Sequence, residues 1–191
     1  MRIGVLGAAR IAPAALVKPA QVVDGVEVGA VAARDRRRAE AFAARYGVPA
    51  VHDSYAAVLA DPSLDAVYVP LPNGLHARWT LAALKAGKHV LCEKPFTSNA
   101  AQAREVAAAA DGTGLVVMEA FHYRYHPLAR RMAELVRGGE LGRIERVETA
   151  MCFPLPRFSD IRYDFSLAGG ALMDAGCYAV HAMRLLAPVP R

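Results

Sequence analysis

The chain has 191 residues, of which 54% are hydrophobic and 21% charged, and a formal net charge of +5 at pH 7. It is too apolar for a disordered chain, and it is long enough for one domain of ordinary size or for one domain and part of another. The basic residues are scattered apart from one cluster, and this cluster has no interleaved aromatic residues. We therefore expect no nucleic-acid partner.

Cysteine usage and hydropathy indicate a cytoplasmic protein. Cys92, Cys152 and Cys177 are an odd number without CxxC spacing, which favours reduced thiols, and we expect no metal site. No uncharged apolar run approaches the ~18–20 residues that a membrane span needs, so no membrane partner is expected. Arg10 and Lys18 interrupt the apolar N-terminus, which is typical of a first strand rather than of a targeting peptide.

Strands and helices alternate over residues 1–120, and the strands are continuous apolar runs, as in parallel strands buried on both faces. This order predicts a doubly wound α/β domain with a parallel Rossmann sheet over residues 1–120. A ligand should then lie at the carboxyl ends of the strands. The expected strands are 2–7, 26–33, 50–52, 66–69, 89–92 and 115–118, and the expected helices begin near residue 11 and cover 39–46, 58–59, 79–86 and 99–110.

The pattern changes in residues 121–191, which we interpret as an incomplete second domain of the α+β type. Apolar residues at helical spacing predict helices over 128–136 and 171–186. Residues 143–153 alternate in character, which predicts one long strand, and residues 154–168 are rich in Pro, Asp and Arg, as in a loop. A single strand needs partners to be stable.

The first strand ends in a candidate dinucleotide-binding turn. The segment from Gly7 to Ala12 reads Gly-Ala-Ala-Arg-Ile-Ala and matches G-x-G-x-x-G/A with Ala at the second and third positions. Gly7 permits the tight turn, and the amides that follow can hold a diphosphate. Ala9 limits how closely the diphosphate approaches. Many strand–helix turns carry Gly, but this turn follows a strand at residue 2 and opens a βα unit.

The end of the second strand favours NADP over NAD. An NAD site places Asp or Glu there, whereas this chain has Ala33 and Arg34. The acid that would repel a 2′-phosphate is missing, and a guanidinium that could bind it is present. Arg34 could alternatively be the solvated start of a helix, and Asp35 keeps NAD open as a second possibility.

Two further groups of residues suggest redox chemistry on an alcohol or carbonyl. Lys94 follows a buried strand at the ligand-facing edge, where it would lie near a bound nicotinamide, although a lysine at a strand end is usually only a surface residue. Asp174 and Tyr178 are four apart on a predicted helix and so share a face, with His181 close to it. A tyrosine beside an ammonium has a lowered pKa and can exchange a hydroxyl proton as hydride moves. Tyr178 and His181 could also be core residues, and for His181 we favour that interpretation.

Together these residues resemble the glucose–fructose oxidoreductase, inositol dehydrogenase and rhizopine-catabolism (Gfo/Idh/MocA) family of NAD(P)-dependent oxidoreductases. The resemblance covers nearly the whole chain, and it is most similar to the dihydrodiol dehydrogenase and D-xylose dehydrogenase branch, which has Tyr where inositol dehydrogenases have His. The segments that carry it are 7–12, 69–73 with His76, 86–90 with 93–95, 119–121 with 123–127, and 169–178.

The resemblance implies hydride transfer between NADP, or NAD, and a sugar or related diol. It implies that Lys94, Asp174 and Tyr178 are catalytic, with Tyr178 as the proton donor or acceptor, and that Arg162 faces the substrate. The cofactor-binding residues that it implies are Gly7, Ala9, Arg10, Ile11, Arg34, Leu71, Pro72, Asn73, His76, Glu93, Lys94 and Arg124.

The chain departs from the family in length. Family members continue into an open sheet that covers the active site and usually forms the dimer, and here we expect only its first strand. The resemblance therefore also implies a homo-oligomer formed through the C-terminal sheet region. The alternative is a truncated chain that binds dinucleotide or associates with a partner without turnover.

Overall fold

The computed structural model describes residues 1–186 of the chain. The polypeptide divides into two units, one of Met1–Glu119 and one that begins at Ala120. The boundary directly follows the last strand, which ends at Glu119.

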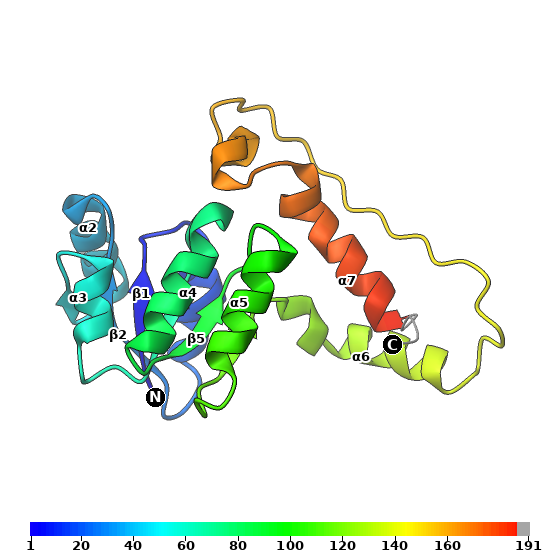
Figure 1. The fold of residues 1–191 in the computed structure, drawn as a ribbon, viewed down its shortest axis with the longest axis horizontal. Coiled ribbons are helices and arrows are strands. Elements are labelled where there is room, and N and C mark those ends of the chain that lie inside the picture. The colour runs from blue at the N-terminus through cyan, green and yellow to red at the C-terminus, as the bar shows by residue number, and fades with distance from the viewer. Residues whose placement is uncertain (187–191) are drawn as a thin grey trace. The chain divides into compact units, whose positions relative to one another are not determined.

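The first unit contains a six-stranded sheet in the order β3-β2-β1-β4-β5-β6, with every neighbouring pair parallel. This confirms the doubly wound parallel sheet (Figure 1). The strands are β1 (Arg2–Leu6), β2 (Glu27–Ala32), β3 (Ala50–Val51), β4 (Ala66–Val69), β5 (His89–Cys92) and β6 (Val117–Glu119). The helical elements are η1 (Pro13–Val17, a π-helix), α1 (Lys18–Ala20), α2 (Arg36–Tyr46), α3 (Tyr55–Ala60), η2 (Asn73–Leu75), α4 (His76–Lys85) and α5 (Ala100–Ala110).

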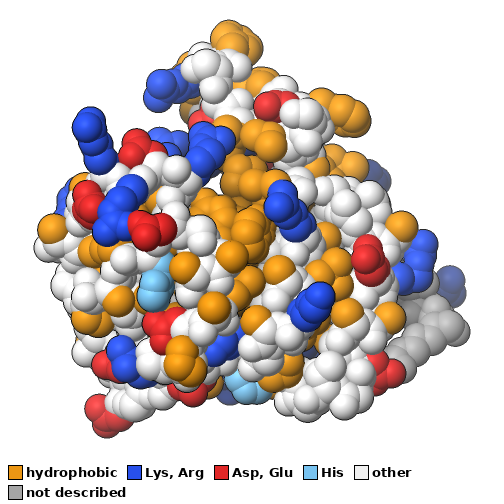
Figure 2. Space-filling view, turned by 60° about the vertical axis from the view of Figure 1, so that its left-hand side comes forward, with side chains coloured by type: hydrophobic (Ala, Val, Ile, Leu, Met, Phe, Trp, Pro, Cys, Tyr) orange, Lys and Arg blue, Asp and Glu red, His pale blue; other side chains and the backbone are white. Residues whose placement is uncertain are grey.

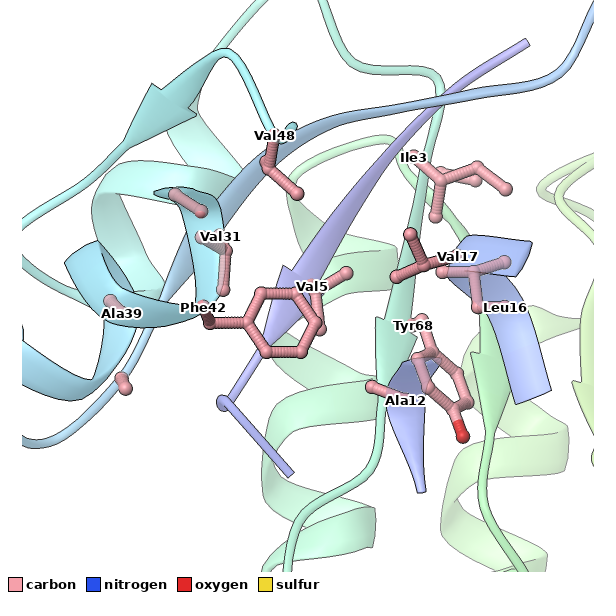
Figure 3. Close-up of a cluster of buried hydrophobic side chains, with 13 residues drawn as sticks. Ile3, Val5, Ala12, Leu16, Val17, Val31, Ala39, Phe42, Val48 and Tyr68 are labelled. Carbon is pink, nitrogen blue, oxygen red and sulfur yellow. The ribbon is translucent and has the colours of Figure 1, made fainter. Parts of the chain in front are cut away.

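Alternate residues of the strands face two hydrophobic layers. Val5 and Val31 belong to a layer covered by η1 and α2, which also holds the Phe42 and Tyr68 rings (Figure 3). Leu6 belongs to the opposite layer, which is covered by α3 and α4. Side chains of α4 and α5 pack on each other in a third cluster. Helices therefore cover both faces of the sheet, as expected when the strands are continuous apolar runs.

Side chains fix where several helices begin and end. Asp35, Ser54 and Asn99 each accept a backbone hydrogen bond at the start of α2, α3 and α5. Such caps satisfy N–H groups that have no partner inside the helix. Gly47 ends α2 in the left-handed conformation, where a glycine has no steric penalty.

The second unit is largely helical. Its described elements are η3 (His122–Tyr125), α6 (Pro127–Arg137), η4 (Ile161–Tyr163), η5 (Phe165–Leu167), η6 (Leu172–Gly176, a π-helix) and α7 (Cys177–Leu186). The helices expected over 128–136 and 171–186 are both present, the second with a π-helical first part.

The prediction of a strand over residues 143–153 is wrong. This segment is extended in Figure 1 but is not assigned as a strand, and within residues 1–186 no strand pairs with it. A strand is defined by ladder hydrogen bonds to a neighbour, and alternation of side chains cannot replace them.

The distribution of charged side chains and the length of the helices agree with what the sequence predicts. On the face shown in Figure 2, basic and acidic side chains are interspersed rather than segregated. None of the helices in the described part of the chain is long and apolar enough to cross a membrane.

Candidate functional site

The carboxyl ends of β1, β2, β4 and β5 lie at one edge of the first unit, because all strands run in parallel. The strand order reverses between β1 and β4, and ligands of open α/β sheets bind at such a switch point. The structure thus brings Gly7, Arg34, Pro72 and Lys94 to loops at the same edge, as the sequence predicts. Phe121 follows β6 and falls in the second unit.

The turn after β1 is tight at Gly7. Its φ is +116°, and an added Cβ would lie 3.1 Å from Leu71 Cδ2, so only glycine fits without strain. The Gly7 N–H donates to Ala32 O at 2.7 Å, and the Ala9 N–H donates to Gly7 O at 2.8 Å. Ala9 is half-buried, whereas Arg10 and Ile11 are exposed. The turn continues into the π-helix η1 with Pro13 at its start rather than into a regular α-helix.

The turn after β2 separates the roles of its charged residues. Asp35 Oδ1 accepts from the Arg37 N–H at 3.0 Å and caps α2, so this carboxylate satisfies the helix terminus. Arg36 pairs with Glu40 and Asp53, and Arg38 Nη2 donates to Ala8 O at 3.1 Å. Arg34 is exposed.

This arrangement fits a 2′-phosphate better than a free ribose 2′-hydroxyl. One oxygen of the acid that could bind ribose hydroxyls, Asp35 Oδ1, accepts an N–H of the helix, and Arg34 is exposed to solvent beside it. Arg38 adds a second guanidinium next to the Gly7 turn. The sequence does not reveal this position of Arg38, because its contact with Ala8 depends on how α2 packs.

The backbone around Lys94 is held by two acidic side chains. Glu93 Oε2 accepts from the Lys94 N–H at 3.2 Å, and the buried Tyr68 hydroxyl donates to Glu93 Oε1 at 2.7 Å. Glu119 Oε1 accepts from the Phe96 N–H at 2.7 Å. Burial raises the pKa of Glu119, and the Phe96 N–H opposes this. The Lys94–Pro95 peptide bond is cis.

Neither Tyr68 nor Glu119 was predicted as a site residue. A tyrosine in a continuous apolar strand needs a partner for its hydroxyl, and an acid at the end of a buried strand lies at the ligand-facing edge. These two signals are present in the sequence and could have identified both residues.

Leu71, Pro72 and Asn73 follow β4 and are half-buried at the same edge. His76, which begins α4, is fully buried. Its Nδ1 lies 2.7 Å from Pro95 O and its Nε2 lies 2.8 Å from Leu71 O. Both ring nitrogens therefore face protein carbonyls, which favours an indirect role for His76 at this edge over direct contact with a cofactor.

The second unit brings Arg162 to Asp174. Arg162 Nε lies 3.2 Å from Asp174 Oδ2, and its Nη1 lies 3.6 Å from Asp160 Oδ2. A cavity of about 460 Å³ includes Arg162 and Asp174 in its lining, together with the apolar side chains of Met151, Phe153 and Phe165. A charged pair at an otherwise apolar cavity is a typical arrangement for orienting a polar ligand.

Tyr178 lies in an aromatic cluster of the second unit. Its ring centroid is 5.4 Å from that of Phe121 and 5.9 Å from that of Tyr123. Asp174 is in the π-helix η6, whereas Tyr178 is in α7, so the regular 3.6-residue repeat does not hold between them. Arg124, on η3, is exposed.

His181 is tied into the same cluster. It stacks on Phe121 with ring centroids 4.2 Å apart, and its Nδ1 lies 2.5 Å from the Tyr123 hydroxyl oxygen. Burial, followed by the nearby Arg124 guanidinium, lowers the pKa of His181. These contacts agree with the structural role expected from the sequence.

Residues 1–186 contain no group of three or more His, Cys, Asp or Glu side chains that could hold a metal ion.

Comparison with known proteins matches the two units to two domains of one protein family. Residues 1–121 match the family model described as "Oxidoreductase family, NAD-binding Rossmann fold", and residues 129–190 match the GFO/IDH/MocA C-terminal domain. The D-xylose 1-dehydrogenase (NADP(+)) 2 of Haloferax volcanii is 49% identical over 191 residues, which are 100% of this chain and 58% of that protein. The trans-1,2-dihydrobenzene-1,2-diol dehydrogenase of Mus musculus is 36% identical over 163 residues, 84% of this chain and 48% of that protein.

Solved structures agree. A variant of a 3-ketoreductase from Actinomadura kijaniata, in complex with TDP-benzene and NADP, has a TM-score of 0.90 and 40% identity, over 97% of this chain and 57% of that one. An aldose-aldose oxidoreductase from Caulobacter crescentus has a TM-score of 0.89 at 28% identity, over 97% and 57% of the two chains. The chain thus spans about half the length of these relatives. With a family match that covers both of its units, this chain belongs to the Gfo/Idh/MocA oxidoreductase family.

Proposed function

We propose that the chain is part of an NADP-dependent oxidoreductase that transfers hydride between the nicotinamide and a hydroxyl-bearing carbon of a sugar or related diol. The xylose dehydrogenase and the dihydrobenzenediol dehydrogenase are named for such compounds. The xylose dehydrogenase and the 3-ketoreductase are associated with NADP by name or by complex.

The observation that carries this proposal is the turn after β2. Asp35 is used as the cap of α2, while Arg34 is exposed next to it. NADP differs from NAD by the 2′-phosphate, so an exposed guanidinium next to an aspartate that caps a helix favours NADP. Gly7, Ala9, Arg10 and Ile11 would line the diphosphate. Leu71, Pro72, Asn73, Glu93, Lys94 and Arg124 would border the ribose and nicotinamide.

Catalysis is assigned to Lys94, Asp174 and Tyr178. NADP, when bound, would supply or accept the hydride, and Tyr178 would exchange the proton of the substrate hydroxyl. The contact of Arg162 with Asp174 orients that carboxylate and places Arg162 at the cavity of the second unit, where it would face substrate.

Variants of the 3-ketoreductase support the choice of Lys94 and Tyr178. Its solved structures include one with a tyrosine changed to Phe and one with a lysine changed to Ala. The same number of positions separates that lysine and tyrosine in the relative as separates Lys94 and Tyr178 here.

Turnover of NADP with D-xylose and other aldoses, followed by the absorbance of NADPH, tests the assignment in the whole protein of which this chain is part. Tyr178→Phe should lower kcat by ~10²–10⁴-fold, as for loss of one general acid–base group, while the affinity for NADP is unchanged. Lys94→Ala should lower kcat at least as much. Tyr46→Phe, on α2, is the matched control and should have no effect.

Full turnover by Tyr178→Phe together with inactive His181→Ala would assign proton transfer to His181 instead. Absence of turnover on aldoses, diols and keto sugars by the whole protein of which the chain is part would contradict the proposed reaction.

We further propose that the protein forms a homo-oligomer through its second unit, where large apolar side chains such as Phe158 and Phe165 are exposed. We also propose a cytoplasmic location, a reducing compartment in which the thiols of Cys92, Cys152 and Cys177 would stay reduced.

A further inference from the structure

We propose that His76 is a positioning residue that ties the segment after β4 to the segment after β5 and so holds the backbone of Lys94 at the cofactor edge. The inference rests on the proposed function only in the use it assigns to Lys94. The tie itself is a property of the first unit.

The His76 ring has no surface left for a ligand. The residue is 0% exposed, and each ring nitrogen lies within hydrogen-bond distance of a backbone carbonyl, Pro95 O at one side and Leu71 O at the other. A carbonyl oxygen can only accept, so the ring is a donor in this arrangement. A neutral ring donates one of the two bonds, and a protonated ring donates both.

The two carbonyls belong to neighbouring loops. β4 and β5 pair in parallel with Val69 opposite Cys92, so Leu71 and Pro95 leave the sheet side by side. The first carbonyl is in the segment Leu71–Asn73 and the second directly follows Lys94. A single buried side chain thus contacts both of the segments that would border the ribose and nicotinamide, and it donates a hydrogen bond to at least one of them.

The other contacts of the second segment involve different groups from the Pro95 carbonyl. Glu93 accepts from the Lys94 N–H, Glu119 accepts from the Phe96 N–H, and the Cys92 thiol lies 3.7 Å from Phe96 O. His76 adds a link that crosses to the β4 loop. Without the His76 contacts, the backbone at Lys94 would be held less firmly to the loop that follows β4.

Hydrogen exchange of the full chain without cofactor tests the tie directly. In His76→Leu, the amides of residues 71–75 and of 93–96 should both exchange about tenfold faster, the factor that corresponds to one lost hydrogen bond. Peptides from β1 and β2 should be unchanged. His76→Gln keeps an amide donor and should restore part of the protection, and Thr80→Val, buried on the same helix, is the control.

Faster exchange in only one of the two segments would overturn the proposal, because it would show that His76 does not couple them. Equal acceleration throughout the first unit would also overturn it, because it would show only that the whole fold is less stable. Should His76→Leu fail to fold, the wild-type chain decides. A ring N–H of His76 must then give an NMR signal that is protected from exchange and close to Leu71 or Pro95, and its absence would refute the tie.

NADPH binding, followed by fluorescence, separates this inference from the proposed function. His76→Leu should weaken binding relative to Thr80→Val, with partial recovery in His76→Gln. If the wild-type chain binds no NADPH, the proposed function fails, while the exchange pattern still decides whether His76 connects the loops.

Discussion

Asp61 illustrates what hydrogen bonds do at a single charged residue of the first unit. Its Oδ1 accepts from the Ser63 hydroxyl and N–H at 2.7 and 2.8 Å, and its Oδ2 lies 2.9 Å from His52 Nε2. These contacts, with the Ser63 hydroxyl first, lower the pKa of Asp61 from 3.8 to about 2. The folded state therefore holds this proton less tightly than the unfolded state does.

This difference predicts a pH dependence of stability. The stabilisation from the Asp61 carboxylate is complete above pH 3.8 and is lost as the pH falls to about 2, because the unfolded state binds the proton first. Urea unfolding between about pH 5 and about pH 2, chosen to bracket this window, should give a shallower decline for Asp61→Asn than for the wild type. Parallel declines would show that the contacts of Asp61 do not contribute.

Single residues also show how far sequence alone reaches in the site. Gly7, Arg34 and Lys94 could be placed because each follows a recognisable strand, and parallel strands bring their ends together. The contacts of Tyr68 with Glu93 and of His76 with Pro95 join residues far apart in the chain. No local pattern specifies such contacts, so they become visible only in the fold.

Among the elements, the helices were the most predictable, because their backbone hydrogen bonds form within the element itself. Helices such as α2 and α5 satisfy their backbone internally and carry capping residues that the sequence displays. The segment 143–153 has the side-chain pattern of a strand but no described partner, so that prediction was wrong. The π-helices η1 and η6 were predicted as ordinary helix, because hydrophobic spacing does not resolve the wider turn of a π-helix.

The cap of α5 gives a prediction at this scale. Asn99 Oδ1 accepts from the Gln102 N–H at 3.0 Å, and Gln102 Oε1 accepts in return from the Ser98 N–H at 3.1 Å. Asn99→Ala should lower the free energy of unfolding by about 1 kcal/mol in urea, whereas Asn99→Ser keeps an acceptor and should lower it less. Equal values for Asn99→Ala and the wild type would show that the cap contributes nothing to stability.

For the whole molecule, the exposed apolar side chains of the second unit set the expected behaviour in solution. Phe165 is 91% exposed, Phe158 80% and Leu172 69%. Apolar surface of this kind favours association. We expect concentration-dependent self-association in sedimentation experiments and binding of a hydrophobic dye. A monodisperse monomer that binds no dye would contradict this expectation.

Titration of the chain with NADP and with NAD tests the central claim most directly. NADP should bind more tightly, and Arg34→Ala should weaken NADP by ~1–3 kcal/mol, as for loss of a charge-assisted contact, while NAD is unaffected. Arg45→Ala, at the far end of α2, is the matched control and should leave both affinities unchanged. Equal affinity of the wild type for the two cofactors, or an equal loss for both in Arg34→Ala, would contradict the assignment of this edge to NADP.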